Sequence, residues 1–63
     1  MKENNTWTET LSDDVVILFN PTRTPNRITI QKRGETPTHL DYPKITYKEI
    51  CRARAIAKEA FKL

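Results

Sequence analysis

The stretch that decides the fold is residues 46–63, TYKEICRARAIAKEAFKL. Thr46 and Glu49 have the spacing of a capping box, in which the threonine hydroxyl accepts from the Glu49 amide while the Glu49 carboxylate accepts from the Thr46 amide. Pro43 lies just upstream, where no helix has to continue. The pattern predicts a helix that begins at Tyr47.

One side of this helix is apolar and rich in small residues when successive residues are placed about 100° apart. It comprises Tyr47, Ile50, Ala53, Arg54, Ala57, Ala60 and Phe61. We expect this side to pack closely against a sheet. The opposite side is expected to face solvent, with Ile56 as its one large apolar residue and Cys51 near its edge.

The helix also stacks like charges on one another. The pairs at i,i+4 are Lys48 with Arg52, Arg54 with Lys58, and Lys58 with Lys62, and each destabilises an isolated helix by a few tenths of a kcal/mol. Lys58 and Lys62 lie near the negative end of the helix dipole, which favours cations. Lys48 and Arg52 lie in the first turns, where the dipole disfavours them, so we expect a binding partner or a neighbouring acid to compensate.

Two strands are expected before the helix. Residues 15–19 (VVILF) are β-branched or aromatic, and residues 27–32 (RITIQK) alternate between apolar and polar. Residues 20–26 (NPTRTPN) have turn chemistry and should join them as an antiparallel hairpin. Residues 6–11 (TWTETL) also alternate and predict a third strand, the alternative being a frayed tail.

The expected fold class is therefore α+β, a small antiparallel sheet of two or three strands packed against one C-terminal helix (ββα or βββα). Residues 1–63 should form one domain, with residues 1–5 as a disordered tail.

Residues 15–19 are apolar on both faces, and one helix covers only one face of a sheet. The second face could be covered by Trp7 and Leu11, by the expected loop at residues 34–44, or by a second copy of the chain. We expect the chain to cover it, as a monomer, with a homodimer as the alternative.

Composition excludes several classes of protein. The chain has one cysteine and one histidine, which permit no intramolecular disulfide and no local Cys/His zinc cluster. Its apolar runs are too short to cross a bilayer, and residues 1–6 lack the apolar segment of a secretory signal. We expect a soluble cytoplasmic protein without membrane contact.

Residues with catalytic potential stand alone. His39 lies in an expected loop, Cys51 has no histidine nearby in sequence to activate it, and a single glycine, Gly34, cannot form a phosphate-cradling loop. We expect no enzymatic activity, no cofactor and no bound metal.

Charge is distributed unevenly along the chain. Residues 1–14 carry one basic and four acidic side chains, whereas residues 15–63 carry ten basic and four acidic ones, a net charge of +6. Such asymmetry often points to an anionic partner, the alternative being surface charge that keeps a small protein soluble. The expected partner-binding residues are Arg23, Arg27, Lys32, Arg33, Lys48, Arg52 and Ile56.

Three strands followed by a helix over residues 6–63 resemble, in the order of elements, the arm-binding DNA-recognition domains of phage and transposon integrases, which lay their sheet in the major groove. The glycines and dense basic strands of those domains are absent from this sequence. In size and economy the chain resembles phage or mobile-element accessory proteins that occupy a host factor.

Two functions are therefore expected of a small non-enzymatic accessory protein. It binds nucleic acid or a nucleoprotein complex through a basic face. Alternatively, it inhibits or modulates a host protein through an exposed strand edge and the helix surface.

Overall fold

The structure, a computed structural model, describes residues 6–63. The tail expected at residues 1–5 lies outside the described residues. Four strands precede one helix: β1 (Trp7–Ser12), β2 (Val15–Asn20), β3 (Asn26–Lys32), β4 (Thr38–Tyr42) and α1 (Tyr47–Phe61). The predicted α+β class is confirmed, but the sheet has four strands instead of two or three.

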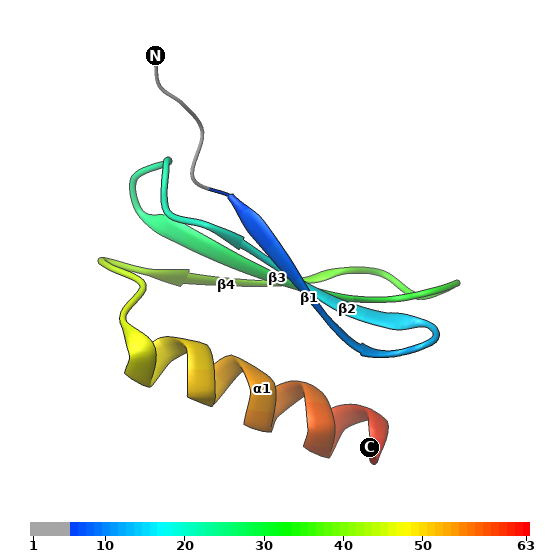
Figure 1. Cartoon of the computed structure of the whole chain (residues 1–63). Helices are drawn as coiled ribbons and strands as arrows, with labels where there is room; N and C mark the ends of the chain where they lie inside the picture. The colour runs from blue at the N-terminus through cyan, green and yellow to red at the C-terminus, as the bar shows by residue number, and fades with distance from the viewer. Residues whose placement is uncertain (1–5) are drawn as a thin grey trace.

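The sheet is an antiparallel meander in the order β1-β2-β3-β4, with α1 along one face (Figure 1). The predicted hairpin pairs Ile17 with Ile30 and Phe19 with Ile28. The predicted N-terminal strand pairs Trp7 with Phe19, and its register shifts between Thr10 and Ser12, which is a β-bulge or similar irregularity. The hairpin and the third strand are thus confirmed.

β4 was not predicted from the sequence. It lies within residues 34–44, which were expected to form a loop. It pairs with β3, Leu40 opposite Ile28 and His39 opposite Thr29. Leu40 and Tyr42 pack against the core. His39 is therefore a strand residue, and its Nδ1 lies 2.9 Å from the Thr29 hydroxyl.

The helix begins and is capped as predicted. The Glu49 carboxylate accepts from the Thr46 backbone N–H at 2.8 Å and from the Thr46 hydroxyl, within a capping box. At the other end Lys62 adopts the left-handed conformation (φ 56°), and the Leu63 N–H donates to the Lys58 carbonyl at 2.9 Å.

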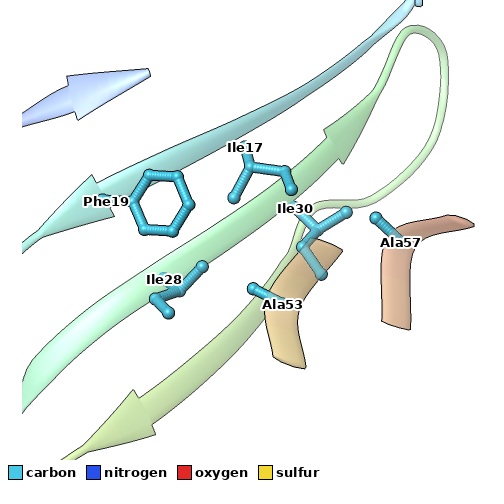
Figure 2. Packing of buried hydrophobic residues seen from close by; sticks show 6 residues of the cluster. All are labelled: Ile17, Phe19, Ile28, Ile30, Ala53 and Ala57. Atoms are coloured by element: carbon cyan, nitrogen blue, oxygen red, sulfur yellow. The ribbon is translucent and has the colours of Figure 1, made fainter. Parts of the chain in front are cut away.

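The core lies between α1 and the two central strands. It consists of Ile17, Phe19, Ile28, Ile30, Ala53 and Ala57, all buried (Figure 2). The helix contributes only alanines to this buried set, so its backbone can lie close to the sheet. Two residues expected on the packed side are exposed instead: Tyr47, at 74% of its surface, and Ala60.

No segment of residues 6–63 covers the second face of the sheet. Val16 is half-buried and Leu18 is 38% exposed. The expected cover fails because Trp7 pairs with Phe19, and cross-strand partners point to the same face. Trp7 stacks on Phe19, with ring centroids 4.9 Å apart, and Leu11 also packs against the core on the helix side. Both residues therefore serve the face that α1 already covers.

Candidate functional site

Three of the basic side chains form ion pairs within the described chain. Arg27 donates to Asp41 from Nε (2.8 Å) and Nη2 (3.2 Å). Lys32 Nζ lies 3.5 Å from the Asp14 carboxylate. Arg54 binds Glu9. Each of these cations already has an anionic neighbour, so less of its positive charge is available to a binding partner.

Arg27 lies on the open face of the sheet, because Ile28 beside it points to the helix. Its hydrogen bonds are the main cause of the lowered pKa of Asp41, which keeps this carboxyl charged and the pair neutral overall. The strand alternation puts mostly uncharged residues on the rest of this face: Thr8, Thr10, Val16, Leu18, Thr29, Gln31 and His39. The open face is therefore not a basic surface.

Lys32 and Arg33 lie at the end of the sheet that carries the β1–β2 turn. Lys32 sits 5.7 Å from the centre of the Phe61 ring. Arg33 donates its backbone N–H to the Asp14 carbonyl at 2.8 Å. Its side chain borders a shallow hollow of about 270 Å³ with Asp13, Asp14, Val16 and Gln31. Acids and bases are mixed at this end.

The remaining basic side chains of residues 6–63 are exposed and make no ion pair. They are Arg23, Arg33, Lys44, Lys48, Arg52, Lys58 and Lys62. Five of the seven belong to the helix, its C-cap or the segment that leads into it. The largest concentration of uncompensated positive charge is therefore around α1.

Four of these residues form what we call the helix basic face: Lys48, Arg52, Lys58 and Lys62. At 100° per residue they lie within about 120° of one another around the axis, on the side away from the sheet. They extend over about 21 Å at 1.5 Å per residue. Glu59 lies within this arc and makes no ion pair in the described chain.

The other acid of the helix, Glu49, is hydrogen-bonded to the N-cap residue Thr46. Hydrogen bonds from Thr46 are the main cause of the lowered pKa of Glu49. Its carboxylate therefore remains charged while engaged at the helix start, and it makes no ion pair with Lys48 or Arg52.

Ile56 is 37% exposed, as the sequence analysis predicted. It follows Arg54 by two residues, about 200° further round the helix. Because Arg54 reaches the β1 edge through Glu9, Ile56 lies on the opposite flank, toward β4. An apolar side chain thus borders Arg52, one turn away.

The predicted partner-binding residues therefore do not share one surface. Lys48, Arg52 and Ile56 lie together on α1, and Arg23 lies on the loop at the same end of the molecule as the helix start (Figure 1). Arg27 lies on the open sheet face, and Lys32 and Arg33 lie at the opposite end. Lys44, which was not among the predicted residues, is also exposed, two residues before the cap.

Other reactive groups are isolated. In residues 6–63 no group of three or more His, Cys, Asp or Glu side chains is placed to hold a metal ion. Cys51 is half-buried, and its interaction with the Tyr47 hydroxyl is the main cause of the raised pKa of that tyrosine. Among the same residues no helix is both long and apolar enough to cross a membrane.

Comparisons of the chain with protein-family models, with curated proteins and with solved structures gave no match.

Proposed function

We propose that the protein is a small non-enzymatic accessory protein that binds nucleic acid, alone or in a nucleoprotein complex, through the helix basic face. The observation that carries the proposal is the lack of acidic partners for Lys48, Arg52, Lys58 and Lys62 in the described chain. The basic residues on the strands and on the sheet side of α1, by contrast, are ion-paired.

This arrangement has a cost in the unbound protein. Lys48 and Arg52 repel each other across one turn and lie near the positive end of the helix dipole. No described acid pairs with either of them. An array of phosphates would supply the missing negative charge, and counterions released from the nucleic acid would drive the association.

The geometry favours the helix over the sheet as the binding element. α1 lies along one face of the sheet (Figure 1). Its buried residues are Ala53 and Ala57, so the helical period puts the basic face on the side away from the sheet, and a major groove about 12 Å wide admits an α-helix. The open sheet face has Arg27 neutralised by Asp41. It therefore lacks the cations that the sheet-in-groove mode of integrase arm-binding domains would need.

The test is a salt titration of binding. A fluorescently labelled DNA duplex of about 20 base pairs and random sequence is titrated with the protein, and the dissociation constant is measured by anisotropy between about 50 and 200 mM salt. Four phosphate contacts predict a slope of log affinity against log salt of about −3.6. An affinity that is undetectable at low salt, or independent of salt, would refute the proposal.

A protein target is the second candidate, and two features support it. Ile56 is exposed beside Arg52, and β1 and β4 form the two edges of the sheet. An exposed edge can pair with an extended peptide. Pro37 and Pro43 bracket β4, however, and proline limits how far an edge strand can be extended.

A further inference from the structure

A single side chain ties together two loops at the end of the molecule where α1 starts. Asn26 donates from Nδ2 to the Pro21 carbonyl (3.2 Å) and to the Arg23 carbonyl (2.7 Å). Its Oδ1 accepts from the Ile45 N–H at 3.1 Å. One half-buried amide thus holds the β2–β3 loop against the segment that joins β4 to α1.

Both loops carry an exposed cation. Arg23 lies in the β2–β3 loop, and Lys44 lies in the β4–α1 segment, next to the residue that Asn26 binds. The β2–β3 loop, the end of β4 and the start of α1 all lie at one end of the molecule (Figure 1). Lys48 and Arg52 follow in the first turns of the helix.

Two acids in electrostatic contact with these cations, Asp41 and Glu49, are already engaged in hydrogen bonds. Asp41 accepts two hydrogen bonds from Arg27, and Glu49 accepts from Thr46. The pKa of Asp41 is lowered mainly by its hydrogen bonds with Arg27 and, to a smaller extent, by the charge of Arg23, which places Arg23 within electrostatic reach of this end of β4. Neither acid forms an ion pair with Arg23, Lys44 or Lys48.

We infer that Arg23, Lys44, Lys48 and Arg52 form one composite phosphate-binding surface, here called the helix-start surface, and that Asn26 is the positioning residue that holds its loop half against its helix half. The ligand class is the sugar–phosphate backbone of duplex DNA. The inference rests on the proposed function and extends it from the helix onto two loops.

A positioned loop matters because of entropy. An arginine on a mobile loop loses conformational freedom when it binds a phosphate, whereas a loop fixed in advance has already lost it. Three hydrogen bonds of the Asn26 side chain fix the backbone of the β2–β3 loop, which carries Arg23, and of the β4–α1 segment, which carries Lys44. The loop charge can then act together with the helix charge on one stretch of backbone.

Charge-removing variants test the surface with the random-sequence duplex as the probe. Arg23→Gln and Lys44→Gln each remove an exposed cation that makes no ion pair in the described chain. Each should weaken binding about eightfold at 0.1 M salt and make the salt slope shallower by about 0.9. Arg33→Gln removes the same charge at the opposite end and should leave the slope unchanged.

Asn26→Ala tests the positioning role. A protein that is merely less stable loses part of its active fraction but keeps the wild-type salt slope. A protein with a misplaced Arg23 keeps its circular dichroism spectrum and has a shallower slope, by about the same 0.9 as Arg23→Gln. The double variant Asn26→Ala with Arg23→Gln should then be no weaker than Arg23→Gln alone. If Asn26→Ala does not fold, Asn26→Thr, which places a strand-forming residue at the start of β3, takes its place.

The outcomes separate this inference from the proposed function. If the wild-type protein shows no salt-dependent binding to the duplex, both are overturned. If it binds, and Lys48→Gln weakens it while Arg23→Gln and Lys44→Gln do not, the proposed function stands and the composite surface is refuted. A wild-type slope in a folded Asn26 variant refutes the positioning role.

Discussion

Arg54 joins the helix to the first strand by a bidentate contact with Glu9, in which Nε lies 2.7 Å from Oε1 and Nη2 lies 2.7 Å from Oε2. The two residues are separated by most of the chain, and the buried core lies on the central strands instead. This pair therefore fixes the β1 edge of the sheet to α1. It also explains why a charged residue lies on the side of the helix that packs against the sheet. Arg54 lies at the edge of that side and its guanidinium contacts Glu9 on β1.

The Glu9 contact makes stability depend on pH. Hydrogen bonding from Arg54 is the largest cause of the lowered pKa of Glu9, which has an ordinary value of 4.5. Because the folded pKa lies below the unfolded one, the stabilisation is present above about pH 4.5 and is lost as the pH falls through the folded value. We expect the thermal midpoint to drop on acidification through this range, and to drop less in Glu9→Gln.

Asp41 and Asp14 also have lowered pKa values, because of hydrogen bonds from Arg27 and Ser12 respectively. Their contribution persists in Glu9→Gln, so acidification should still destabilise that variant. Glu35→Gln is the matched control, since Glu35 makes no ion pair in the described chain. Equal pH profiles for wild type and Glu9→Gln would show that the contact with Arg54 contributes nothing in solution.

The capping box predicts a second stability effect. Thr46→Ala removes the hydroxyl that contacts Glu49 at the helix start, and the loss of an N-cap residue costs on the order of 1 kcal/mol. Chemical denaturation measures this difference. Thr36→Ala, in the exposed β3–β4 loop, is the control and should change stability little. An unchanged free energy of unfolding in Thr46→Ala would mean that the cap does not hold the helix start.

The helix and the hairpin were predictable because their signals are local. The cap spacing, the run at residues 15–19 and the alternation at residues 27–32 each lie within one element. β4 was missed because Thr38–Tyr42 contains a histidine and an aspartate and is bracketed by prolines, which are features of a loop. Its strand character comes from pairing with β3, and its own signal was limited to the spacing of Leu40 and Tyr42.

The same limit applied to the candidate site. Lys48, Arg52 and Ile56 were recognisable from helical spacing alone. From the sequence, Arg27, like the helix cations, was expected to bind a partner. Its ion-pair partner Asp41 lies on β4, the strand that was not predicted. The role of Asn26 depends on a contact with Ile45, 19 residues away, and turn composition gives no sign of it.

The two faces of the sheet predict different costs of truncation, tested at Ile28 on β3 and Leu18 on β2. Ile28 is fully buried between the sheet and α1, and Ile28→Ala should cost about 2–5 kcal/mol because it leaves a cavity. Leu18 is 38% exposed on the open face, so Leu18→Ala should cost much less. Denaturation curves compare the two. A large cost at Leu18 that depends on protein concentration would indicate a second copy covering this face.

Trp7 reports on β1 by its fluorescence. It stacks on Phe19 at an interplanar angle of 12° and is 38% exposed. Emission should therefore be moderately blue-shifted from that of free tryptophan and should shift back on unfolding. Emission at the wavelength of free tryptophan in the native protein would contradict the pairing of β1 with β2.

The basic residues of the first helical turns provide the most direct test of function. Replacing both Lys48 and Arg52 by glutamine removes a like-charge pair near the positive end of the dipole, so the free energy of unfolding should stay the same or rise. Binding to duplex DNA should weaken, with a salt slope shallower by about two units. Denaturation and anisotropy, measured on the same preparation, separate an effect on binding from an effect on folding.

Ile56→Asp distinguishes the two candidate functions in the same assay. For a nucleic-acid partner, the new negative charge beside Arg52 weakens binding by no more than the double glutamine variant does, because Ile56 itself contacts no phosphate. For a protein partner, Ile56 is an apolar anchor, so Ile56→Asp should abolish a nuclease-resistant complex while the glutamine variant weakens it less. A double glutamine variant that retains full affinity for its natural target would show that Lys48 and Arg52, the half of the helix basic face at the helix start, have no role in binding.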